Sequence, residues 1–104
     1  MIVAEFFENG GEIKGFKING HAGYDDYGKD IACASVSSVV QMTVNAITDV
    51  FGFEADVSAQ NNTVFFKTAS GDIVLQKLYK AFIMQLELLS QEFNETIKIK
   101  FTEV

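Results

Sequence analysis

Apolar and polar residues alternate through the first twenty positions, as they do along strands that bury one face. Residues 2–8 and residues 12–20 form two such runs, and Asn9-Gly10-Gly11 separates them. An Asn-Gly pair between two apolar runs is a hairpin signal, because both residues accept the positive φ of a tight turn. The polar face of the second run ends at His21. This part of the chain therefore predicts a β-hairpin.

A second hairpin and a last strand are predicted further along. Residues 53–60 alternate cleanly, residues 63–68 continue the apolar pattern, and Asn61-Asn62 lies between them. Asparagine tolerates positive φ, so this pair suits a two-residue type I′ turn. Residues 96–102 form the last predicted strand, with three inward side chains: Ile97, Ile99 and Phe101.

Between the two hairpins the apolar period changes to three or four residues, which is the spacing of a helix with one buried face. This first predicted helix has Asp30 as its N-cap and ends before Gly52, where a C′ glycine commonly stops a helix. Its apolar positions are Val36, Val40, Val44, Ile47 and Phe51. We expect residues 22–29, which have no period, to form a loop.

A second helix is predicted after residues 63–68, with Ser70 as its cap and Asp72 near its positive end. The side chains expected to face the core are Val74, Leu78, Ala81, Phe82, Leu88 and Leu89, and Leu75, Met84 and Leu86 widen the apolar arc. The element order is ββαββαβ. We predict a single α+β domain over residues 1–104, with two helices packed on one mixed, mainly antiparallel sheet.

Composition agrees with a folded domain. The chain has 104 residues, of which 48% are apolar and 21% charged, as in ordinary globular proteins, so intrinsic disorder is excluded. Its uninterrupted apolar runs are far shorter than the ~20 residues that cross a bilayer. The first residues lack the pattern of a secretory signal. We therefore expect a cytoplasmic protein with no membrane partner.

Charge narrows the partners further. All eight cations are lysines, and fourteen carboxylates give a net charge of −6. Without arginine the chain lacks the planar fork that grips phosphates and guanines, so we expect no direct nucleic-acid binding and favour a basic partner. One cysteine and one histidine exclude an internal disulfide and a thiolate-rich zinc site. We predict no metal and no cofactor.

The single histidine, His21, ends a predicted strand, and the single cysteine, Cys33, begins a predicted helix. With Asp30 as N-cap, Cys33 is the third helical residue, where unpaired N–H groups stabilise a thiolate and can receive an oxyanion. His21 faces away from the core and could serve as its base. The residues alone leave open that Cys33 is a small buried apolar residue and His21 an ordinary surface histidine.

Other polar residues near this pair are weaker candidates. Asp30 could orient His21, although capping is the favoured role. Ser37 lies one turn after Cys33 and either lines the site or bonds back to its own helix. Two adjacent acids, Asp25 and Asp26, lack the spaced ligands of a calcium loop and are expected to be solvated.

Two short elements carry a resemblance to a known family. Gly20-His21-Ala22 and Gly28-Lys29-Asp30-Ile31-Ala32-Cys33-Ala34-Ser35-Val36-Ser37 resemble the pattern of the ribosomal-processing cysteine proteases, the Prp family. The chain length and the element order fit throughout. Two departures are small: Ala32 replaces a commonly larger aliphatic residue, and Ser35 replaces a small apolar one.

The resemblance implies a cysteine endopeptidase with Cys33 as nucleophile and His21 as general base. Gly20, Asp30 and Ser37 would support the site or the substrate. The implied substrate is a large-subunit ribosomal protein, whose N-terminal extension is removed by cleavage in a hydrophobic, Phe-containing motif. The resemblance also implies a homodimer and a flexible loop over residues 22–29. We expect an apolar recess, formed partly by the second helix, to take the substrate's aromatic side chain.

Two other functions remain open at this stage. The chain could be a non-catalytic module that docks on a basic ribosomal protein, with Cys33 buried and inert. It could also be a redox-sensing thiol, although it lacks a resolving cysteine within the chain.

Overall fold

The computed structural model describes residues 1–20 and 27–104, and for residues 27–30 it describes the backbone alone. The strands are β1 (Ile2–Asn9), β2 (Glu12–Asn19), β3 (Asp56–Gln60), β4 (Thr63–Lys67) and β5 (Ile97–Glu103). The helices are α1 (Tyr27–Asn45), continued by the π-helix η1 (Ala46–Val50), and α2 (Ile73–Glu92). Strands and α-helices follow the predicted ββαββαβ order.

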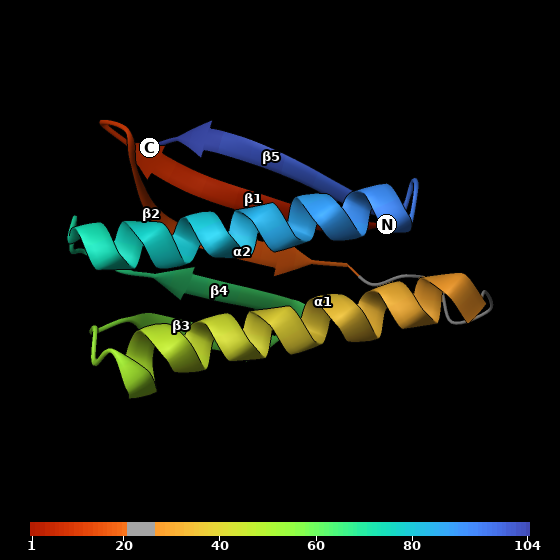
Figure 1. Cartoon of the computed structure of the whole chain (residues 1–104), viewed down its shortest axis with the longest axis horizontal. Coiled ribbons are helices and arrows are strands. Elements are labelled where there is room, and N and C mark those ends of the chain that lie inside the picture. Colours follow the sequence, from red (N-terminus) through yellow and green to blue (C-terminus); the bar gives the residue numbers. More distant parts are fainter. Residues whose placement is uncertain (21–26) are drawn as a thin grey trace.

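The five strands form one sheet in the order β3-β4-β2-β1-β5. β5 runs parallel to β1, and every other neighbouring pair is antiparallel. The sheet is therefore mixed and mainly antiparallel, as predicted. α1 and α2 lie side by side on one face of it, with α1 over the β3–β4 side (Figure 1).

Both hairpins lie where the sequence predicts them, but the central pair of the first turn is Gly10-Gly11 and not Asn9-Gly10, because Asn9 is the last residue of β1 and pairs with Glu12. Gly10 and Gly11 have φ of 59° and 82°, and Asn61 and Asn62 have φ of 54° and 59°. Positive φ at both central residues is the requirement of a type I′ turn. β3, however, begins at Asp56 rather than at residue 53. The reason is local, because the backbone N–H of Phe53 bonds to the carbonyl of Ile47 and this bond, which closes the C-terminal turn of the helix, holds the chain away from the sheet.

An aromatic cluster forms the core between the sheet and α2. Phe16 lies at its centre, with ring centroids 4.8 Å from Phe82, 5.0 Å from Phe66 and 5.9 Å from Phe6. The contact with Phe66 is stacked, and those with Phe6 and Phe82 are tilted or edge-on; aromatic pairs of these kinds add stability beyond the area that they bury. All four rings are fully buried or nearly so.

The buried face of α2 differs from the predicted one. The side chains that face the core are Leu75, Tyr79, Phe82, Leu86 and Leu89. Val74 and Leu88 were expected inward but are 40% and 58% exposed. Apolar side chains lie nearly all round this helix, so their pattern does not fix its rotation, and the prediction did not include Tyr79. Inside the fold, the hydroxyl of Tyr79 forms a hydrogen bond with the hydroxyl of Thr68, the residue after β4.

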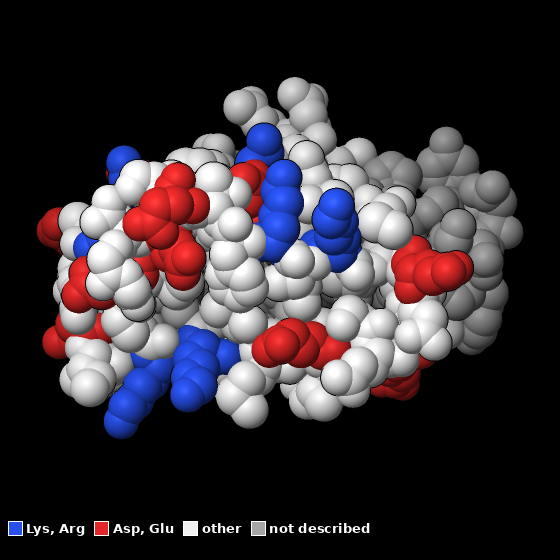
Figure 2. Space-filling view, turned by 90° about the horizontal axis from the view of Figure 1, so that it is seen from above, with Lys and Arg blue, Asp and Glu red and all other residues white. Residues whose placement is uncertain are grey.

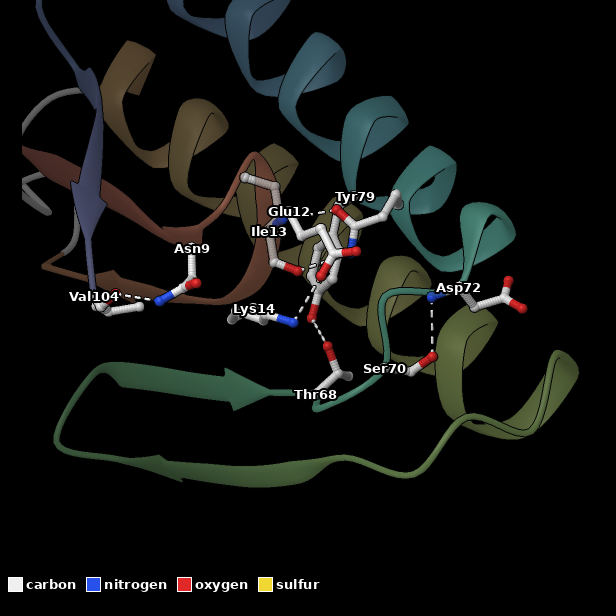
Figure 3. A network of polar contacts seen from close by, with 10 residues as sticks. Asn9, Glu12, Ile13, Lys14, Thr68, Ser70, Asp72, Tyr79 and Val104 are labelled. Carbon is white, nitrogen blue, oxygen red and sulfur yellow. Dashed lines mark hydrogen bonds and ion pairs between the residues drawn. The ribbon is translucent and has the colours of Figure 1, made fainter.

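The cap of α2 also differs. Asp72 is the N-cap, since its carboxylate accepts the N–H of Val74 at 2.8 Å. The hydroxyl of Ser70 instead accepts the N–H of Asp72 at 3.0 Å (Figure 3). The predicted cap residue thus forms the turn before the cap, and the two bonds together direct the chain into the helix.

α1 starts earlier than predicted and ends through an unforeseen π-turn. Tyr27 is its first residue, so Asp30 lies inside the helix and is not its N-cap. Differences in propensity of less than about 1 kcal/mol per residue separate the possible starting points, which sets helix boundaries only weakly. At the other end the N–H of Phe51 bonds to the carbonyl of Ala46, and this wider turn leaves Phe51 53% exposed. Gly52 follows at φ 76°, the C′ glycine that was predicted.

Part of this helical stretch is unusually apolar. Within the described part of the chain, Ile31–Val50 is the one segment whose length and composition would allow it to cross a membrane. In this fold Val36, Val40 and Ile47 are buried in the core. The buried face therefore accounts for part of the apolar character.

Because of Tyr79, the fold is expected to lose stability at alkaline pH. Its ring is fully buried, and its hydroxyl lies 2.6 Å from that of Thr68 (Figure 3). Burial raises the pKa of Tyr79 from 10.0 to about 12. The folded state therefore holds this proton more tightly than the unfolded chain does. The stability linked to it is complete below about pH 10 and is lost as the pH rises toward about 12.

We expect urea unfolding to show this loss of stability at high pH. In the Tyr79→Phe variant the contribution of this residue to the pH dependence should be absent. The variant loses a constant amount of stability, because the buried hydroxyl of Thr68 is left without its partner. Its free energy of unfolding then falls less steeply than that of the unaltered chain between about pH 10 and 12. The lysines titrate alike in both proteins and cancel in the comparison. Equal slopes would contradict the assignment.

Candidate functional site

One stripe of α1 forms a wall of a pocket of about 340 Å³. The five helix residues that line it are Cys33, Val36, Ser37, Val40 and Gln41. Their spacing of three and four positions places them on a single helical face. Cys33 and Ser37 therefore line one cavity, as the sequence predicted.

The opposite wall comes from the ends of four strands. β1 contributes Ile2, β2 leads to Ile18 and Gly20, and the remaining residues, Ala59, Gln60, Asn62, Thr63 and Val64, belong to the β3–β4 hairpin. Strand register brings these segments together, because Val64 pairs with Ile18 on one side and with Ala59 on the other. No residue of α2 is in this lining. α2 instead lines a separate, largely apolar pocket of about 380 Å³ between itself and α1, through residues such as Leu78 and Phe82. The expected contribution of the second helix to a substrate recess therefore stays a prediction.

The pocket combines an apolar floor with neutral polar groups. Its large apolar side chains are Ile2, Ile18, Val36, Val40 and Val64, and its polar ones are Ser37, Gln41, Gln60, Asn62 and Thr63. Acidic and basic side chains are interspersed on the molecule's surface (Figure 2), yet none of the described residues that line this pocket is charged. Burying a charge is costly, so such a site favours an uncharged ligand with apolar side chains.

Cys33 is half-buried and lines the pocket while it packs against the core. The thiol is thus not sealed among aliphatic groups, as the inert interpretation requires. Its place in the helix is nevertheless not the predicted one, because Cys33 is the seventh residue of α1 and not the third. Only the first four N–H groups of a helix lack a partner. Donors for an oxyanion must therefore come from residues other than Cys33 itself.

Gly20 directly follows the last residue of β2 and lines this pocket. It has φ +77°, and a Cβ here would lie 2.5 Å from the carbonyl oxygen of Met1. Both facts require glycine. His21, Asp25 and Asp26 lie outside the described residues, as does the side chain of Asp30. Within residues 1–20 and 27–104, no three His, Cys, Asp or Glu side chains form a group that could hold a metal ion.

Sequence reasoning missed the contribution of the β3–β4 hairpin. Its residues carry no local signal of a site, because the sheet order decides which strand ends lie opposite α1. Gln41 did carry a signal. It lies two turns from Cys33 and one from Ser37, so helical spacing alone places it on their face.

Comparison with known proteins shows which family this chain is similar to. The family model described as cysteine protease Prp matches residues 1–98. The ribosomal processing cysteine protease Prp of Staphylococcus aureus is 29% identical over 94 residues, which span 88% of this chain and 89% of that protein. The protein of the same name from Bacillus subtilis is 27% identical over 94 residues, 84% of each chain.

A solved structure gives the same fold. The crystal structure of Prp from S. aureus in complex with a covalently linked product peptide superimposes with a TM-score of 0.87. The alignment covers 98% of this chain and 100% of that one, at 24% sequence identity. The arrangement of helices and sheet is thus shared along the whole chain.

Proposed function

The chain belongs to the Prp family of cysteine proteases, and on this basis we propose that it removes the N-terminal extension of a large-subunit ribosomal protein. The cleavage falls within a hydrophobic motif that contains Phe. The ribosomal processing named for the relatives from S. aureus and B. subtilis supports this substrate class. The observation that carries the proposal is the cysteine thiol of Cys33 in the wall of a largely apolar pocket, whose described lining residues carry no charge.

The proposed chemistry is covalent catalysis. The Cys33 thiolate attacks the carbonyl carbon of the scissile peptide, the C–N bond breaks, and an acyl thioester forms on the sulfur. His21 gives a proton to the leaving amine. It then takes one from a water molecule, whose oxygen hydrolyses the thioester and releases the acid and the thiolate. The S. aureus Prp structure holds a covalently linked product peptide, which agrees with a covalent route.

Several described features support this assignment. Gly20, the residue before His21 in the chain, lines the same pocket as Cys33. A volume of about 340 Å³ lies in the range of ligand pockets, ~300–1,000 Å³. The apolar floor suits an aromatic side chain, and Ser37 places a hydroxyl one turn from the thiol.

The setting of this activity is also proposed. We place the enzyme in the cytoplasm as a homodimer, acting on its basic substrate without binding nucleic acid or a membrane. An acidic chain with net charge −6 suits a basic substrate.

The test is incubation of the purified chain with the extended ribosomal protein, followed by mass spectrometry. We expect the extension to be released by one cut in the Phe-containing motif, and pretreatment with iodoacetamide to prevent it. The ribosomal protein without its extension is the control and should keep its mass. Stable binding without any cut would contradict the proposal and indicate the non-catalytic docking module.

A further inference from the structure

The pocket extends well beyond the thiol along α1. Cys33 and Gln41 are eight residues apart on the same face, which corresponds to about 12 Å along the helix axis at ~1.5 Å per residue. An extended peptide advances ~3.3 Å per residue. The pocket therefore has room for about three to four extended residues between the thiol and its far end.

Two glutamines lie on opposite walls of this pocket. Gln41 comes from α1, Gln60 comes from the end of β3, and both are exposed. A side-chain amide offers donors and an acceptor together, which is also what a peptide group offers. Because both side chains are exposed and line the pocket, a peptide bound there can reach their amides.

The same chain shows how a glutamine holds a main chain. The side chain of Gln76 accepts the N–H of Ile13 at 2.7 Å and donates to the carbonyl of Ile13 at 2.9 Å. One amide thereby satisfies both polar groups of a single residue. This pairing reads no side chain, so it fixes the position of a strand without selecting its sequence.

We propose that Gln41 and Gln60 form a second subsite, which binds the main chain of the substrate residue three or four positions from the scissile bond. This inference rests on the proposed protease function and adds a length requirement to it. The subsite favours residues with uncharged side chains, because none of the described residues that line the pocket is charged. Its role is to hold the peptide in register with Cys33.

The experiment compares the glutamine variants on peptides of different lengths. Peptides copying the cleavage motif are shortened residue by residue from either end, and kcat/KM is measured for the unaltered chain, Gln41→Ala and Gln60→Ala. We expect each variant to lower kcat/KM about tenfold on the longest peptide, mainly through KM, as the loss of a hydrogen bond does. The effect should vanish once fewer than three residues remain on one side of the scissile bond.

Gln91→Ala is the matched control, an exposed glutamine near the end of α2 and outside the pocket lining. It should leave kcat/KM unchanged on every peptide. If Gln41→Ala and Gln60→Ala leave cleavage unchanged, or lower it equally at all lengths, the subsite is wrong and the protease function stands. If the unaltered chain cuts no peptide and no extended protein, the proposed function itself fails.

Discussion

Cys33→Ala is expected to abolish cleavage of the extended ribosomal protein and to leave the fold intact. Removing the nucleophile of a covalent mechanism lowers kcat by three orders of magnitude or more, roughly, because no other group forms the intermediate. The chain has no second cysteine that could substitute. Cys33 is only half-buried, so loss of its sulfur costs little packing. Mass spectrometry of the substrate measures the loss of cleavage, and circular dichroism of the variant measures whether the fold is intact.

His21→Ala tests whether the pair acts as a unit. We expect nearly as large a loss as for Cys33→Ala, and no further loss in the double variant, since residues of one catalytic unit are strongly non-additive. Ser37→Ala is the comparison within the pocket and should reduce the rate far less. Losses that multiply in the double variant would show that His21 and Cys33 act independently and would overturn the assigned roles.

Phe16→Ala should be the most destabilising single change to the core. Its ring is fully buried and packs against the rings of Phe6, Phe66 and Phe82. Truncation of a buried Phe to Ala costs about 3–5 kcal/mol, against a total stability of about 5–15 kcal/mol for a domain. We expect a large fall in the urea midpoint, measured by circular dichroism, and partial unfolding at ordinary temperature.

Phe51→Ala is the matched control, since Phe51 is 53% exposed at the end of η1. Its cost should be within about 0.5 kcal/mol. Should Phe16→Ala fail to fold at all, Phe16→Leu gives a measurable intermediate loss, because it keeps most of the buried apolar volume. Equal midpoints for the Phe16 and Phe51 variants would contradict the placement of the core.

The sequence predicted best those features that local chemistry decides. Both hairpins depend on residues that accept positive φ, Gly10-Gly11 and Asn61-Asn62, and both are confirmed. Gly52 ends the first helical stretch for the same reason. The parallel pairing of β5 with β1 has no local signal, and only the assembled sheet shows it.

Helix phase and boundaries were harder to predict. α2 has apolar residues nearly all round, so the contact between Tyr79 and Thr68, not its hydrophobic pattern, reveals the buried face. In the first helical stretch the π-turn changes the spacing, and Phe51 therefore leaves the core face that a uniform helix would give it.

In the candidate site, too, the sequence predicted what local spacing decides and missed what the assembled sheet decides. Helical spacing placed Cys33 and Ser37 on one helical face, and both residues line the same pocket. The wall from the β3–β4 hairpin depends on sheet order, which the sequence did not determine. The role of His21 lies outside the described residues and stays a prediction from the resemblance.

The neighbour of β1 on one side is β5, which follows it in the chain by about ninety residues. Ile2 pairs with Ile97 and Glu8 with Glu103, and the side chain of Asn9 donates to the carbonyl of Val104, 95 positions away. During translation β1 therefore keeps one hydrogen-bonding edge unsatisfied until the end of β5 has left the ribosome. A nascent chain stalled before residue 97 would expose that edge beside the apolar face of Ile2, Ala4 and Phe6, a combination prone to pair with other chains.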